Sequence, residues 1–99
     1  MLTMLQYPVG IKEFTVAMHA GAAVLSVAMQ NGKPCMWVLS DKTAPLVPHL
    51  FYTLPTGEDA PEFIGDLIFV GTFQSPSGLL SFSLFDAGEE EQDDEEGEE

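Results

Sequence analysis

The chain has 99 residues and a formal net charge of −13, because it contains 16 Asp and Glu against three Lys and no Arg. This composition excludes an ordinary nucleic-acid binder and a membrane-surface protein, since both need clustered Lys and Arg. The length allows one domain, and no apolar run approaches the roughly 20 residues that a membrane-spanning helix needs.

Strand signals dominate the chain. Short apolar segments rich in Val, Phe, Leu and Thr alternate with Gly, Pro, Asn and Ser, and no long segment carries an unbroken helical stripe. The pattern predicts strands at about residues 2–7, 12–18, 23–30, 34–40, 49–54, 67–74 and 79–85. A single helical turn is expected after Pro61. We therefore expect an all-β domain over residues 1–86, a small antiparallel β-sandwich or partly open barrel of six to seven strands, followed by a disordered acidic tail over 87–99.

The clearest local signal is Asn31-Gly32, which lies between two apolar runs. A two-residue type I′ turn needs positive φ at both positions, and Asn-Gly adopts it at little cost. The resulting hairpin places Val27 opposite Met36 and Leu25 opposite Val38 on one face.

The other face of this hairpin is also apolar. It carries Ser26, Ala28, Cys35, Trp37 and Leu39. The hairpin register predicts Ser26 opposite Trp37, Ala28 opposite Cys35 and Leu39 opposite Val24. One face enters the core, so the other must be covered, and in a domain this small a second copy covers it more easily than the remaining chain does. We predict a homo-oligomer with Ser26, Ala28, Cys35, Trp37 and Leu39 in its interface.

A second hairpin is indicated by Ser75-Pro76-Ser77-Gly78, where Pro suits the first corner of a type I turn. A four-residue loop pairs Gln74 with Leu79 and places Gly71 opposite Phe82, so that the ring lies across the glycine. The core face of this hairpin then carries Phe69, Gly71, Phe73, Leu80, Phe82 and Leu84.

No pattern in the chain predicts an enzyme, a cofactor site or a metal site. Cys35 is far in sequence from His19 and His49, and a strand cysteine opposite alanine is typical of a core hydrophobe. The ligand spacings CxxC, HxH and HExxH do not occur, nor does a glycine-rich phosphate loop. We predict a non-enzymatic protein with no catalytic residues, metal or cofactor.

The acidic C-terminus is the feature furthest from ordinary composition. Residues 89–99 read EEEQDDEEGEE and hold nine of the 16 acids. Such a segment either keeps an apolar sheet soluble or acts as an electrostatic arm toward a basic partner, and the sequence leaves both open. The expected partner-binding residues combine it with an acidic loop: Glu58, Asp59, Glu62, Glu89, Glu90, Glu91, Asp93, Asp94, Glu95 and Glu96.

Several segments resemble an uncharacterised family of small phage and prophage proteins. The most specific is the motif Asn-Gly-x-Pro-x-x-Trp at residues 31–37, and looser matches lie at residues 19–27, 56–57, 69–74 and 80–85. The chain departs from the family pattern at Ser83, where the family has histidine, at residues 54–57 and in the acidic tail. The resemblance implies a phage accessory protein that acts in the host bacterial cytoplasm, and the first ten residues lack the basic and apolar segments of a signal peptide. It implies no activity and no site residues.

These observations give three functional hypotheses. The leading one is a phage protein that binds and inhibits a host protein, for instance one of host defence. It would compete for the basic nucleic-acid-binding surface of that protein without contacting nucleic acid or membrane itself. The second is an oligomeric sponge for a signalling nucleotide, with Trp37, Tyr52 or His49 stacking on the base. The third is a minor structural protein of the virion.

Overall fold

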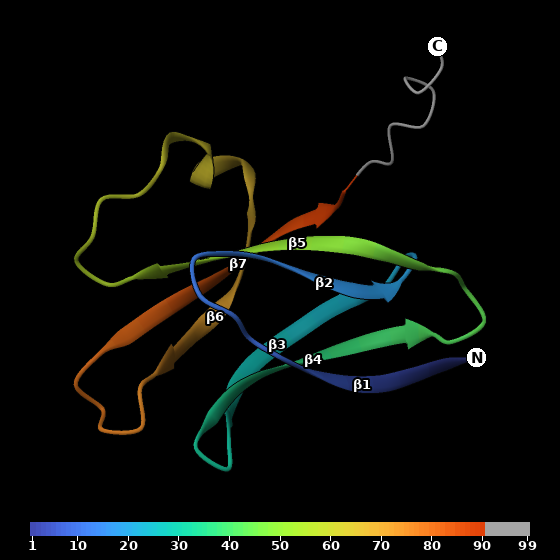
Figure 1. Ribbon diagram of the computed structural model, residues 1–99, viewed down its shortest axis with the longest axis horizontal. Helices are drawn as coiled ribbons and strands as arrows, with labels where there is room; N and C mark the ends of the chain where they lie inside the picture. Colours follow the sequence, from blue (N-terminus) through green and yellow to red (C-terminus); the bar gives the residue numbers. More distant parts are fainter. Residues whose placement is uncertain (91–99) are drawn as a thin grey trace.

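The computed structural model describes residues 1–90 and contains, in that part of the chain, seven strands in two antiparallel sheets (Figure 1). Sheet A has the strand order β1-β4-β3, and sheet B has the order β2-β5-β7-β6. The strands are β1 (Leu2–Pro8), β2 (Glu13–His19), β3 (Ala23–Gln30), β4 (Lys33–Asp41), β5 (Leu46–Pro55), β6 (Ile68–Gln74) and β7 (Ser81–Glu89). The predicted all-β class is confirmed.

The core lies between the inner faces of the two sheets. Alternate residues of β4 and β5 are buried, as expected for strands with one face turned inward. The fully buried apolar side chains come from both sheets and are Met18, Met36, Val38, Phe51 and Leu84. Strands β3 and β6 lie against each other without hydrogen-bonding as neighbours, so the two sheets form a partly open sandwich.

The β3–β4 hairpin has the predicted turn and most of the predicted register. Asn31 and Gly32 have φ of 53° and 80°, and Val27 lies opposite Met36. The predicted pairing of Leu25 with Val38 is wrong, because a bulge between Val24 and Ser26 leaves Leu25 as the extra residue. The bulge turns Val24 toward the core and leaves Leu25 51% exposed. Past the bulge, Val38 pairs with Val24. Leu39 pairs with Ala23, whereas its predicted partner was Val24.

Replacing Gly32 by alanine tests the turn. Its φ of 80° lies in the left-handed region, and a Cβ there would contact nothing within 4 Å, so the penalty is purely conformational. We expect Gly32→Ala to lower the free energy of unfolding by about 1–2 kcal/mol in urea titrations. Gly65→Ala is the matched control, because Gly65 is equally open but has no positive φ. Equal effects of the two changes would contradict this account.

The β6–β7 hairpin differs from its predicted register by two residues. Gln74 pairs with Ser81 rather than with Leu79, because the loop between the bonded residues Ser75 and Leu80 comprises residues 76–79. The amide of Ser75 donates to the carbonyl of Leu80 at 2.8 Å. A shift of two residues leaves each side chain on its predicted face, so Phe82 still lies on the core side, but Leu79 and Leu80 lie outside the strand.

The shift also changes the role predicted for Gly71. This residue lies opposite Leu84 rather than Phe82, and a Cβ on it would come within 3.1 Å of Cγ1 of Val27. A side chain at position 71 would therefore crowd Val27 where β3 lies close to β6, and this close approach, rather than a ring, favours glycine there. Val70 is an extra residue in β6, so Phe69 is exposed instead of entering the core as predicted.

Two short segments complete the described chain. The predicted helical turn after Pro61 is η1 (Glu62–Asp66), a 3-10 helix, and within residues 1–90 no helix has the length and apolar character needed to cross a membrane.

The turn between β4 and β5 is closed by Asp41 and Thr43. The hydroxyl and the amide of Thr43 both donate to the carboxylate of Asp41. These two bonds, the hydroxyl's being the stronger cause, hold the pKa of Asp41 below its usual value.

Strand β7 continues further than the sequence predicted. It ends at Glu89, three residues beyond the expected domain boundary at residue 86. The amide of Glu90 still donates to the carbonyl of Pro48 at 2.8 Å. The part of the predicted disordered tail from residue 91 onward lies outside the described residues.

Candidate functional site

The residues that a nucleophilic site would need lie on different surfaces. Cys35 lies on the outer face of sheet A, whereas His49 is buried between the sheets. His19, at the end of β2, donates from Nδ1 to the carbonyl of Ala44 at 2.8 Å. The structure therefore brings neither histidine to Cys35.

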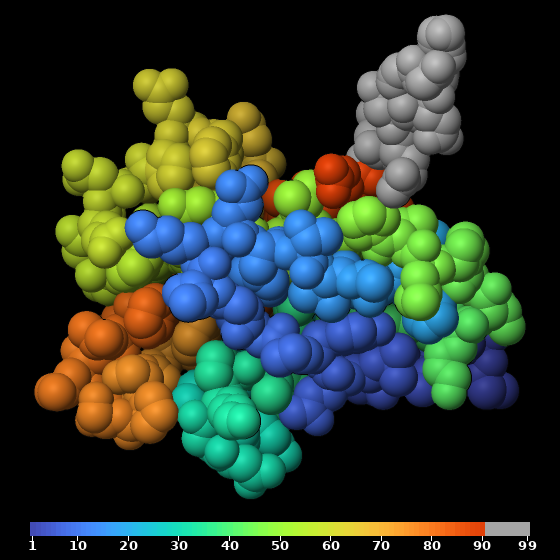
Figure 2. Space-filling model, in the orientation of Figure 1, coloured from blue at the N-terminus to red at the C-terminus, as the bar shows by residue number. Residues whose placement is uncertain are grey.

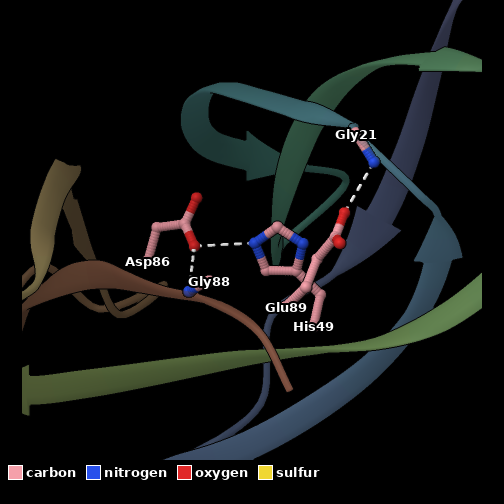
Figure 3. Close-up of polar contacts among 5 residues, drawn as sticks. All are labelled: Gly21, His49, Asp86, Gly88 and Glu89. Atoms are coloured by element: carbon pink, nitrogen blue, oxygen red, sulfur yellow. Dashed lines mark hydrogen bonds and ion pairs between the residues drawn. The ribbon is translucent and has the colours of Figure 1, made fainter. Parts of the chain in front are cut away.

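The buried polar pair of the core is His49 with Asp86 (Figure 3). His49 lies on β5 and donates from Nε2 to Oδ1 of Asp86, on neighbouring β7, at 2.7 Å. The same oxygen accepts the amide of Gly88 at 2.8 Å. Nδ1 of His49 has no hydrogen-bond partner in the described chain, and the imidazole stacks on Phe51 with the ring centroids 4.8 Å apart. With the imidazole enclosed at 4% exposure, the pair fixes β7 against β5 and offers no open position to a substrate.

No metal centre is assembled by the residues that the structure describes, because no group of three or more His, Cys, Asp or Glu side chains there is placed to hold an ion. Asp86 and His49 contribute only two donors, and both already bond within the protein.

The outer face of sheet B carries a shallow hollow. After β5 the chain folds back over this face through η1, and the ring of Phe63 meets the ring of Tyr52 edge-on at 5.5 Å. The hollow has a volume of about 290 Å³, and its lining includes Glu13, Leu50, Tyr52, Phe63, Leu67 and Ala87. It is an aromatic and aliphatic surface with a carboxylate beside it.

Acidic side chains follow the segment that forms this hollow. The segment leaves β5 at Pro55, which lies opposite Phe82, and it re-enters the sheet at Ile68, which lies opposite Asp86. It therefore extends along β7 and ends close to the carboxyl end of that strand. The acids along this path are Glu58, Asp59, Glu62, Asp66, Glu89 and Glu90, all exposed, and we call them the acidic band. Figure 1 shows this segment and the end of β7 along one side of the molecule.

The two described acids of the predicted tail are held in place. The carboxylate of Glu89 accepts the amide of Gly21 at 2.6 Å, which joins β7 to the turn between β2 and β3 (Figure 3). Glu89 and Glu90 are thus a fixed end of the acidic band. The remaining predicted tail residues, Glu91, Asp93, Asp94, Glu95 and Glu96, lie outside the described part of the chain.

The residues predicted for an oligomer interface share one surface. Ser26 lies beside Trp37 and Ala28 beside Cys35, as predicted, on the outer face of sheet A. Strand β1 extends this face, because Met4 lies beside Leu39. Cys35, Trp37 and Leu39 are half-buried, and Ser26 and Ala28 are exposed.

Sequence reasoning missed three members of the surface on sheet B, namely Glu13, Phe63 and Asp66, and it missed the pairing of His49 with Asp86. Glu13 could have been placed there by the alternation of β2, which puts it on the face opposite Phe14. Asp66 and Phe63 reach the surface only because η1 folds back, which no local pattern indicates. Asp86 was not singled out, although its position two residues before a glycine is typical of a side chain that bonds a nearby amide.

Comparison with known proteins gives one match. A family model described as a domain of unknown function, DUF7352, matches residues 1–95. No curated protein and no solved structure matches the chain. Because the match covers nearly its whole length, the chain belongs to the DUF7352 family.

Proposed function

We propose that this protein is a non-enzymatic binding protein that docks through the acidic band onto a basic surface of another protein and inhibits it. In the setting suggested by the resemblance to phage and prophage proteins, the partner is a host protein, for instance one of host defence, and the encounter takes place in the host cytoplasm. The band competes there for a surface that otherwise holds nucleic-acid phosphates.

The observation that carries the proposal is the distribution of charge. Residues 1–90 contain nine acids, and six of them belong to the acidic band. Two of the three lysines lie elsewhere, Lys33 at the tip of the β3–β4 hairpin and Lys42 in the turn before β5. The band borders the exposed rim of Phe63 and the half-buried Tyr52, and aromatic side chains of this kind anchor protein interfaces.

Electrostatic attraction of this kind acts mainly on the rate of association. Exposed carboxylates steer a basic partner toward the band, and salt screens them beyond about 10 Å at 0.1 M ionic strength. Carboxylates can also occupy the Lys and Arg sites of a basic surface that otherwise hold phosphates. Binding should therefore weaken strongly as salt is raised.

The test neutralises the described loop of the band with Glu58→Gln, Asp59→Asn and Glu62→Gln together. We expect this variant to lose at least about tenfold in affinity, roughly 1.4 kcal/mol, for proteins that the native chain captures from bacterial lysate at low salt. A purified captured protein should also lose its binding to a labelled DNA or RNA when the native chain is added. Asp41→Asn, one acid outside the band, is the control and should leave capture unchanged.

A separate truncation after Glu90 measures what residues 91–99 add. If the neutralised variant and the truncated chain both capture the same proteins as the native chain, with the same salt dependence, the proposal is wrong.

The nucleotide-sponge alternative gains no support from the single chain, because its three candidate stacking residues lie in different places. Trp37 lies on the outer face of sheet A, Tyr52 lies on the outer face of sheet B, and His49 lies in the core.

A further inference from the structure

We propose that two copies of this chain pair through their β1 strands, antiparallel and centred on Met4, so that the two three-stranded sheets A become one continuous sheet. This inference does not rest on the proposed function. It concerns a different surface, the free edge of sheet A, and it has the opposite dependence on salt.

The free edge belongs to β1. Within residues 1–90 this strand hydrogen-bonds only with β4. The amide of Val9 donates to the carbonyl of Pro34 at 3.1 Å and extends the β1–β4 register, so the odd-numbered residues of β1 direct their backbone groups toward β4. The amides and carbonyls of Leu2, Met4 and Gln6 consequently point away from the sheet. Figures 1 and 2 show β1, in dark blue, along the outer border of the molecule.

The other sheet edges of the described chain carry features that oppose pairing. The edge strand β3 has the bulge between Val24 and Ser26, and β6 has an irregularity between Phe69 and Gly71. Strand β2 carries Glu13. Natural proteins protect free edges in these ways, with charges, bulges or proline.

Strand β1 lacks such protection over most of its length. It reads LTMLQYP, has no charged residue and keeps a regular register from Leu2 to Pro8. Its outward side chains include Leu2 and Met4, which are 59% and 48% exposed. A regular, uncharged and apolar edge is the kind that receives another strand.

The pattern of donors fits a second copy of the same strand. Pro8 has no amide hydrogen, so the free edge offers donors at Leu2, Met4 and Gln6 alone, and these three are symmetric about Met4. A two-fold axis at Met4 places Leu2 opposite Gln6 of the second copy, and every free amide and carbonyl of the three residues then has a partner. A register that includes Pro8 leaves a carbonyl without a donor.

The charge distribution permits this pairing and sets its salt dependence. The acids of the band lie on sheet B and its loop, away from β1, but two chains of net charge −13 still repel each other. Salt screens that repulsion, so the dimer should become more stable as salt is raised. Docking onto a basic partner should weaken under the same change, which separates the two proposals.

A disulfide experiment tests the register. In the full-length chain carrying Cys35→Ser, Met4→Cys places two thiols on opposing residues whose Cα atoms lie about 5.5 Å apart, within disulfide reach. Gln6→Cys is the matched control, because the same register separates its two copies by about 13 Å along the strand. Mild oxidation should give a covalent dimer from Met4→Cys and little from Gln6→Cys. Equal yields, or a higher yield from Gln6→Cys, would overturn the register.

A second experiment tests the edge itself by sedimentation. Met4→Pro removes an amide that points to solvent in the monomer, so it should spare the fold and raise the dimer dissociation constant at least about tenfold. Met4→Lys should do the same and serves if the proline variant fails to fold by circular dichroism. Trp37→Gln alters the outer face of sheet A and should leave the dimer largely intact. A native chain that stays monomeric at high salt, or a dimer lost in Trp37→Gln but kept in Met4→Lys, refutes edge pairing.

Discussion

Replacing Phe51 by alanine should lower the free energy of unfolding by about 3–5 kcal/mol. Phe51 lies on β5, with β2 on one side and β7 on the other, and its side chain is only 1% exposed. Its ring stacks on Phe14, with the centroids 5.3 Å apart, and on His49, with the centroids 4.8 Å apart, so truncation leaves a cavity beside both rings. A domain of about 90 residues has on the order of 4–13 kcal/mol of stability, so this one change removes a large share of it.

Urea unfolding followed by Trp37 fluorescence and circular dichroism measures the loss. Phe63→Ala is the control, because that ring is 48% exposed on the outer side of sheet B and leaves no closed cavity. We expect the control to lose less than about 1 kcal/mol. If the two variants unfold at the same urea concentration, the core does not lie where the structure places it.

The strands could be read from the sequence because each one follows a simple alternation. In β2, for example, Phe14, Val16 and Met18 turn inward while the residues between them turn outward. Turn chemistry supplied the β3–β4 register, since positive φ at Asn31 and Gly32 leaves one way to close the hairpin.

The irregular features could not be predicted in the same way. The bulge at Leu25 forms because Val24, rather than Leu25, packs against the core. Both residues are apolar, so hydrophobicity does not indicate which of them turns inward. The choice between a loop of residues 75–78 and one of residues 76–79 places the same side chains on the same faces, so hydrophobicity does not decide it.

The candidate site was only partly predictable for a related reason. In the sequence, Glu58, Asp59 and Glu62 indicate a charged loop. The direction in which that loop folds, however, depends on the contact between Phe63 and Tyr52. The contact joins residues of a loop and a strand and has no local signature. The pairing of His49 with Asp86, 37 positions apart, likewise follows only from β5 lying beside β7.

That buried pair gives the second large effect. Asp86→Ala should lower the free energy of unfolding by about 3 kcal/mol, because it removes the acceptor of both the His49 imidazole and the Gly88 amide. The imidazole would then have no partner at either nitrogen among the described residues, since Nδ1 has none in the native protein. Asp86→Asn keeps a carbonyl oxygen at the same position and should lose only about 1 kcal/mol.

A double-mutant cycle separates the pair from simple loss of packing. His49→Phe removes the buried donor and keeps a ring that can stack on Phe51, so Asp86→Ala should cost less in that background than in the native chain. We expect a coupling free energy of about 1–2 kcal/mol between the two positions. The remainder of the Asp86 effect reports the amide of Gly88, where β7 bulges against β5. Strictly additive effects would mean that the imidazole and the carboxylate do not stabilise each other. The pairing of β5 with β7 would then be stabilised by the backbone hydrogen bonds between the strands and by the bond from the Gly88 amide to Asp86.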